Sequence, residues 1–212
     1  MREPHRGTLA RACAALAALG VAIPAHAAGG PLRIDHRWSF DDSGIWNRSN
    51  QTALRYSTWI AVGAGALWEG SDSRLGKTLW QSVDSLVIGG LTAEGMKRIF
   101  TRTRPIVSND PDLWFQGRGH YSFPSGEVME VTTAITPFVL EYGSEHPAVW
   151  ALELLPLYMS VGRLKQQAHW QTDVLASFAI GSAIGAYAHS RQSAISVGVL
   201  PRGITIGWKK SF

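Results

Sequence analysis

Two basic side chains begin the part of the sequence whose residue types could carry out chemistry. Lys97 and Arg104 are seven residues apart, and Pro105 follows directly. Seven residues are about two turns of an α-helix, so a continuous helix would present both cations on one face, where they suit a phosphate group. A basic helix end also complements the helix dipole and can simply face water, so this segment alone does not establish an anion site.

A second segment lies where a loop meets a predicted helix and reads Ser-Phe-Pro-Ser-Gly-Glu over residues 122–127. Ser125 is predicted to be the N-cap of that helix. Together with Gly126 it leaves backbone N–H groups available at the positive end of the helix, and such an end binds anions. Many helices begin with Pro-Ser-Gly without binding an anion, so this motif is also weak by itself.

The third segment contains Arg163, His169 and Asp173. His169 and Asp173 are four residues apart, so on a helix the carboxylate would accept a hydrogen bond from one ring nitrogen while the other faces a pocket. A nucleophilic histidine requires that orientation. The alternative is a His–Asp pair on the surface that only supports its helix.

In this order, the three segments resemble the signature motifs of the type 2 phosphatidic acid phosphatase and vanadium haloperoxidase superfamily. Those motifs are Lys-x6-Arg-Pro, Pro-Ser-Gly-His and Ser-Arg-x5-His-x3-Asp. The resemblance implies a pocket in which three cations neutralise phosphate oxygens while Ser125 and the Gly126 amide donate hydrogen bonds. Nine positions match at the family spacing: Lys97, Arg104, Pro105, Pro124, Ser125, Gly126, Arg163, His169 and Asp173.

The resemblance also implies a mechanism. His169 would attack phosphorus, and Asp173 would hold the imidazole in the attacking tautomer and stabilise its positive charge. The resulting phosphohistidine would then be hydrolysed by water. Lys97, Arg104 and Arg163 would take the part that a metal ion has in other phosphoryl-transfer sites, so neither a metal nor a cofactor is expected.

The chain departs from the family pattern at Glu127 and Gly162, which stand where the family has histidine and serine. The family's histidine is the general acid that protonates the leaving alkoxide, whereas a free glutamate has a pKa of about 4.3 and is ionised at neutral pH. Burial and bound phosphate could raise the Glu127 pKa; a diphosphate substrate could need little acid; or hydrolysis could be lost. His120 is a candidate substitute donor or an exposed loop histidine.

The segments that must position these residues have helical patterns. An all-α bundle of about five core helices is predicted, with its core over residues 52–190, followed by a short C-terminal β-hairpin over 194–212. The Pro-, Asn-, Asp- and Gly-rich stretch 105–125 is predicted to be an irregular functional loop. The five predicted helices cover residues 52–68, 75–100, 127–142, 147–163 and 170–189.

The first residues resemble an export signal. Arginines precede an alanine-rich stretch, and Ala25-His26-Ala27 offers a small-x-small cleavage site, so residues 1–27 are predicted to be removed and the mature domain, 28–212, to be periplasmic. Cys13, the only cysteine, lies inside this signal. The mature chain is therefore expected to have neither a disulfide nor a thiolate metal site. The formal net charge of +4 includes three arginines and one glutamate of this signal, so the mature domain carries +2, which is too small to indicate nucleic-acid binding.

These observations predict a metal-independent phosphatase that acts on a phosphate or diphosphate ester, with a lipid substrate favoured by the resemblance. The uncharged helix stretches are too short to span a bilayer, but the tryptophans and apolar surfaces would permit peripheral membrane contact. The first alternative is a phosphate-binding envelope protein without hydrolytic activity. A vanadate-dependent haloperoxidase is a weaker one, because that chemistry also depends on the histidine that Glu127 replaces.

Overall fold

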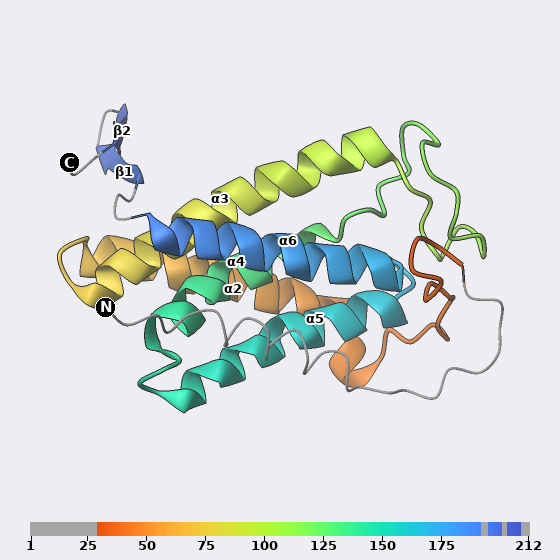
Figure 1. Cartoon of the computed structure of the whole chain (residues 1–212), viewed down its shortest axis with the longest axis horizontal. Helices are drawn as coiled ribbons and strands as arrows, with labels where there is room; N and C mark the ends of the chain where they lie inside the picture. Colours follow the sequence, from red (N-terminus) through yellow and green to blue (C-terminus); the bar gives the residue numbers. More distant parts are fainter. Residues whose placement is uncertain (1–28, 192–194, 201–202, 209–212) are drawn as a thin grey trace, which may run out of the picture.

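The computed structural model describes residues 29–191 and the backbone of residues 195–200 and 203–208. Five α-helices in this part of the chain form an elongated bundle, as Figure 1 shows. The prediction of an all-α protein with five helices is therefore confirmed. The helices are α2 (Arg48–Glu69), α3 (Arg74–Phe100), α4 (Gly126–Tyr142), α5 (Leu154–Lys165) and α6 (Gln171–Ser190).

Local capping determines where the first two helices begin and end. α2 begins four residues before the predicted start because the Asn47 side chain accepts a hydrogen bond from Ser49 N (2.9 Å), directly after the 3₁₀ turn η1 (Gly44–Trp46). Ser73 caps α3 by accepting from Gly76 N at 2.9 Å. α3 ends at Phe100 because Thr101 adopts a left-handed conformation with φ of 34°.

The prediction of one continuous helix over 147–163 was wrong. A 3₁₀ helix, η2 (Pro147–Glu153), comes first, and α5 begins at Leu154. In the interior of a continuous helix, Pro156 would lack an N–H donor and its ring would clash with a preceding carbonyl. Starting α5 at Leu154 places this proline in the first turn, where its nitrogen needs no helical partner.

Helix α4 lies at the centre of the bundle and contacts α2, α3, α5 and α6. Most of its residues are buried, and two glycines of α6 let that helix approach closely. A Cβ on Gly181 would lie 2.9 Å from Cβ of Thr132, and one on Gly185 only 2.5 Å from Cβ of Thr136. One cluster of the core joins α4, α5 and α6 through Val128, Val131, Met159 and Val174.

The loop over residues 101–125 and the lead-in 29–47 lie at one end of the bundle, beside the ends of α3 and α5 and the start of α6 (Figure 1). The loop has neither helix nor strand, as predicted for 105–125. Ile106 N donates to Gln167 O at 2.9 Å, and Trp170 Nε1 donates to Thr103 O at 2.8 Å. These bonds bring the segments that carry the three motifs to the same end of the molecule.

After α6 the chain forms two antiparallel strands, β1 (Ile195–Leu200) and β2 (Gly203–Trp208), within the predicted hairpin 194–212. Their side chains lie outside the described residues, so the predicted role of the hairpin as a cover on the bundle stays a prediction. The predicted signal peptide, 1–27, also lies outside them, and so periplasmic location stays a prediction too. Within the described part of the chain, none of the helices is both long and apolar enough to cross a bilayer.

Candidate active site

His169 is held by a backbone carbonyl. Its Nδ1 lies 2.6 Å from Ser122 O, and because a carbonyl oxygen only accepts, Nδ1 must carry the ring proton. Within the described part of the chain Nε2 makes no hydrogen bond, so its lone pair is available. The ring is 4% exposed and precedes α6 instead of lying on it, which corrects the expectation that His169 and Asp173 share a helix.

Asp173 orients the histidine indirectly, which corrects the expected direct hydrogen bond. Its Oδ2 is 3.9 Å from His169 Nδ1, beyond hydrogen-bond distance. The carboxylate instead accepts from Ser122 Oγ at 2.5 Å and from Trp170 N at 2.9 Å. Asp173 therefore holds the residue whose carbonyl positions the imidazole, and its negative charge lies close enough to stabilise a positively charged ring.

Arg102 holds the Asp173 carboxylate in place through a buried ion pair. The sequence did not single it out as a structural residue. Its fully buried guanidinium pairs with Asp173 at 2.5 Å and with Asp35 at 2.6 Å. It also stacks on Trp114, with 4.3 Å between the guanidinium carbon and the ring centroid. In the sequence, Arg102 is marked only by its position between Lys97 and Arg104 of the first motif.

The cations of the first and third motifs converge on His169. Burial lowers the pKa of His169 well below 6.5, and the charges of Arg163, Arg104 and Lys97 lower it further. Arg163 is buried as well, and burial with the nearby Arg48 and Arg104 lowers its pKa to about 10, so it stays positive at neutral pH. This cluster thus combines a neutral imidazole with fixed positive charges, the arrangement that suits attack on a phosphate.

The proximity of Lys97 and Arg104 arises differently from the prediction. α3 ends at Phe100, so Arg104 lies beyond the helix and not two turns along it. The chain turns back after Thr101, and Arg104 Nη2 lies 3.4 Å from Tyr121 O. Loop folding, and not a shared helix face, therefore brings the two cations to the same pocket.

The lowered pKa of His169 can be measured directly. We expect its C2 proton resonance, assigned by its loss in His169→Asn, to stay unshifted from pH 8 down through about 6.5, where a histidine in an unstructured peptide titrates. Over that range the unfolded chain binds a proton that the folded chain does not, so this group also makes stability fall as pH falls below 6.5. A His169 resonance that titrates at or above 6.5 in phosphate-free buffer would contradict the arrangement described.

The second motif contributes the start of α4. Ser125 occupies the N-cap position as predicted, but its side chain makes no capping bond, and its buried Oγ has no partner among the described residues. Buried Arg163 Nε likewise has none. Lys97 Nζ would lie 2.9 Å from a Cβ on residue 126, so glycine there lets the lysine approach the helix end. Unpaired buried donors are costly, and a phosphate would satisfy them.

Glu127 is paired with a residue from α2. Arg48 Nη1 and Nη2 lie 2.6 and 2.5 Å from its two carboxylate oxygens, and Arg163 Nε lies 3.7 Å from Oε2. Burial alone raises the pKa of Glu127, but the hydrogen bonds from Arg48 and the charges of Arg163 and Arg55 outweigh it, so the pKa lies below 4.5. Without a bound phosphate, this direction is opposite to the one that a general acid requires.

Comparison with known proteins identifies the family. The chain matches the sequence model of the PAP2 superfamily over residues 78–195, more than half of its length. It belongs to the PAP2 superfamily. The resemblance seen in the three motifs is therefore confirmed at the level of the family, and the PAP2 match covers α4, α5 and α6 together with all three motifs.

Two curated PAP2 relatives are lipid phosphatases by name. The chain is 28% identical over 121 residues to a lipid A 1-phosphatase of Porphyromonas gingivalis, covering 56% of this chain and 24% of that protein. It is 29% identical over 130 residues to an undecaprenyl-diphosphatase of Sulfolobus acidocaldarius, covering 60% of each. The chain thus spans less than two thirds of the length of either relative. No solved structure matches it.

The second departure from the PAP2 pattern has a steric reason. A Cβ on Gly162 would lie 2.3 Å from Nε2 of Gln51, a fully buried side chain of α2 that donates to Trp46 O at 2.9 Å. Gln51 thus fills the space that a serine side chain would enter.

His120, the candidate substitute donor, is partly buried, with Nδ1 2.9 Å from Thr103 Oγ1. Among the described residues, no hydrogen bond or ion pair links His120 to Glu127.

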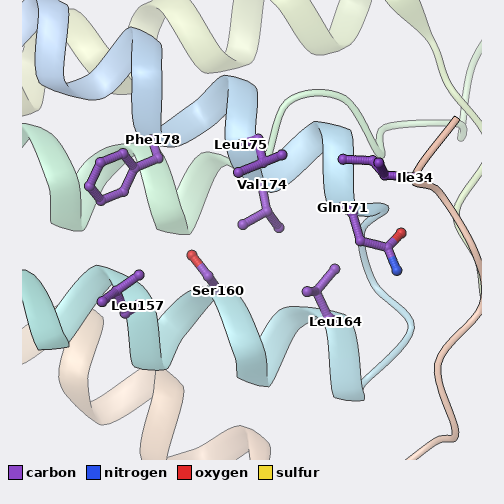
Figure 2. Close-up of a pocket in the computed structure, with 8 residues that line it drawn as sticks. All are labelled: Ile34, Leu157, Ser160, Leu164, Gln171, Val174, Leu175 and Phe178. Atoms are coloured by element: carbon purple, nitrogen blue, oxygen red, sulfur yellow. The ribbon is translucent and has the colours of Figure 1, made fainter. Parts of the chain in front are cut away.

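A mostly apolar cavity of about 250 Å³ opens between α5 and α6, next to the PAP2 motif segments (Figure 2). Leu164 and Val174, which follow Arg163 and Asp173 directly, line it together with Leu175 and Phe178. No charged side chain lines this cavity, so it is distinct from the cluster of Lys97, Arg104, Arg163 and His169. Among the described residues, no group of three or more His, Cys, Asp or Glu side chains is arranged to hold a metal ion.

Proposed function

We propose that this PAP2 protein is a metal-independent phosphatase that hydrolyses a phosphate or diphosphate ester through a phosphohistidine on His169. One observation carries the proposal. An imidazole with its proton committed to Ser122 O and its Nε2 available lies among Lys97, Arg104 and Arg163. A tetrahedral anion bound by these cations would present its phosphorus to Nε2.

In the first proposed step, Nε2 of His169 forms a bond to phosphorus, and the bond from phosphorus to the leaving oxygen breaks with its electron pair on that oxygen. Asp173, 3.9 Å from Nδ1, stabilises the positive charge of the phosphorylated ring. In the second step water attacks phosphorus, the P–N bond returns its electron pair to Nε2, and inorganic phosphate leaves with the hydroxyl of the water.

The fixed cations support the metal-independent part of the proposal. Phosphoryl transfer requires positioning and neutralisation of the charge on the phosphate oxygens more than covalent chemistry by the protein. Arg163 and Lys97 supply that charge from buried or partly buried positions, where it is screened less than in water. Ser125 Oγ and Arg163 Nε, which are buried without a hydrogen-bond partner among the described residues, are the proposed additional donors.

A lipid substrate is the finer part of the proposal. Both relatives described above are named for lipid phosphates, and the apolar cavity between α5 and α6 offers space for part of an alkyl chain beside the third motif. Burial of apolar chain in such a cavity would contribute about 0.8 kcal/mol per methylene group. A long-chain phosphate should therefore bind more tightly than a short-chain phosphate with the same head group.

The proposal is tested by assaying p-nitrophenyl phosphate, a short-chain alkyl diphosphate and a long-chain alkyl diphosphate with and without EDTA and orthovanadate. We expect turnover that survives EDTA, is inhibited by vanadate and shows a lower KM for the long chain. Rapid acid-free quenching with ³²P-labelled substrate should trap a label that is lost in acid and stable in base. Loss of turnover in EDTA that divalent cations restore would overturn metal independence, and equal KM values would overturn the lipid part.

A second candidate function is phosphate binding without hydrolysis, and the ionised state of Glu127 favours it. A pocket that has lost its general acid could retain its cations for binding alone. The same samples decide between the two functions. Saturable phosphate binding by calorimetry with no turnover of any of the three substrates would support the binding protein and overturn the phosphatase.

A further inference from the structure

Arg48 belongs to none of the three motifs, yet its charge reaches the phosphate pocket. From the first turn of α2 it forms a bidentate ion pair with Glu127, in which Nη1 lies 2.6 Å from Oε2 and Nη2 lies 2.5 Å from Oε1. Its positive charge lowers the pKa of both Arg104 and Arg163, which places the three guanidiniums in one electrostatic field. Its side chain is 43% exposed, so it is open to solvent, whereas that of Arg163 is only 7% exposed.

We propose that Arg48, held by Glu127, is the group that stabilises the leaving group, and that this makes the site selective for diphosphate esters. This inference rests on the proposed phosphatase function. Glu127 occupies the sequence position of the family's general acid. Through its ion pair it holds a cation, Arg48, beside that position. A guanidinium holds its protons too tightly to act as a general acid toward an alkoxide, but it stabilises a departing phosphate, whose second pKa is about 6 and which needs no proton to leave.

The charge around the pocket fits such a substrate. Among the described residues, a second ion pair lies one turn along α4: Arg55 bonds to Glu130 at 2.5 and 2.9 Å. Glu127 pairs with Arg48 and Arg163, and Glu130 pairs with Arg55, whereas among the described residues Lys97 and Arg104, the other two of five neighbouring cations, form no ion pair. A diphosphate ester carries one phosphate group more than a monophosphate ester and offers more negative charge to these cations. The five cations are Arg48, Arg55, Lys97, Arg104 and Arg163.

The reaction balances without an acid. Nε2 of His169 bonds to the terminal phosphorus, and the bond from that phosphorus to the bridging oxygen breaks with its electron pair on the bridging oxygen. The leaving group is the alkyl monophosphate dianion, whose negative charge Arg48 helps to stabilise. Water then releases inorganic phosphate from His169, and both protons of that water leave with the phosphate or pass to solvent.

The test compares three substrates that differ in leaving group: farnesyl diphosphate, farnesyl monophosphate and p-nitrophenyl phosphate. The wild-type protein should turn over the diphosphate at least roughly a hundredfold faster than the farnesyl monophosphate, because only the latter must expel an alkoxide. In Arg48→Gln, the ratio of kcat on farnesyl diphosphate to kcat on p-nitrophenyl phosphate should fall by roughly tenfold to a hundredfold. Arg48→Lys should restore part of that ratio.

Arg74→Gln is the matched control. Arg74 is 46% exposed and pairs with Glu141 and Glu145 away from the pocket, so its replacement removes a similar exposed ion pair. The kcat ratio should not change in this variant. Glu127→Gln should lower the ratio about as much as Arg48→Gln, and the double variant should be no worse than either single one, because Glu127 acts through Arg48. Glu127→His should raise turnover of farnesyl monophosphate.

Three results would overturn the inference. An unchanged kcat ratio in Arg48→Gln would show that Arg48 does not act on the leaving group. Faster wild-type turnover of farnesyl monophosphate than of the diphosphate, lost in Glu127→Gln, would show that Glu127 is a general acid. Either result leaves the phosphatase proposal intact. Wild-type protein that turns over none of the substrates would overturn both.

Discussion

His169→Asn is expected to reduce phosphatase turnover by at least about a thousandfold while leaving the fold intact. Asparagine keeps an N–H donor close to the position of Nδ1, so the bond to Ser122 O, 2.6 Å in the native protein, can be retained. It supplies no nucleophile in place of Nε2. The measurement is kcat on p-nitrophenyl phosphate for variant and wild type, with thermal unfolding followed by circular dichroism on the same samples.

His146→Asn serves as the control, because His146 is exposed in the turn before η2 and contacts none of the motif residues. It should keep wild-type turnover. If His169→Asn is folded and retains more than about a tenth of wild-type kcat, His169 is not the nucleophile. The pocket would then bind phosphate for some other reaction.

Arg102→Met is expected to destabilise the protein by about 3–5 kcal/mol, because it leaves two carboxylates buried without their cation. Asp35 and Asp173 are both fully buried and lie 2.6 and 2.5 Å from the guanidinium. The native network stabilises each charge by a partner and by hydrogen bonds, and methionine replaces only the volume. Urea unfolding at neutral pH measures the difference in the free energy of unfolding.

Arg98→Met is the matched control for this loss. Arg98 lies four residues earlier, its side chain is 72% exposed, and its ion pair with Glu94 is within one helix. An exposed pair of this kind contributes less than about 1 kcal/mol. A loss for Arg102→Met as small as that for Arg98→Met would show that the Asp35–Arg102–Asp173 network does not hold the site. Asp35→Asn should be destabilising in the same way, because it removes one carboxylate from the same guanidinium.

Much of the fold followed from local pattern. The five helices could be predicted because long apolar-rich segments, interrupted by Gly and Pro, specify their length and type. The wrong prediction of one helix over 147–163 came from overlooking Pro156, whose missing N–H suits the first turn of a helix that begins at Leu154. The early start of α2 depends on the Asn47 cap. In the sequence this asparagine is one of several polar residues in the preceding loop, and nothing marks it as the N-cap.

The site was predicted less completely than the fold. Residue types and spacing singled out Lys97, Arg104, Arg163 and His169, and the charges of these three cations do act on that histidine. The predicted geometry of the pairs was wrong in two places. Lys97 and Arg104 are brought together by a loop and not by a shared helix face. The Asp173 carboxylate bonds to Ser122 and Arg102 instead of to the imidazole.

By itself the sequence determined the helical class, the family and the residues of the three motifs, because all of these depend on the types and spacing of residues close together in the chain. Only the tertiary structure decided which polar groups pair. Arg102 meets Asp35 across 67 positions and Arg48 meets Glu127 across 79. The physical reason is that an ion pair between distant segments depends on how the helices pack and what they bury. A buried arginine and a solvated one look the same in the sequence.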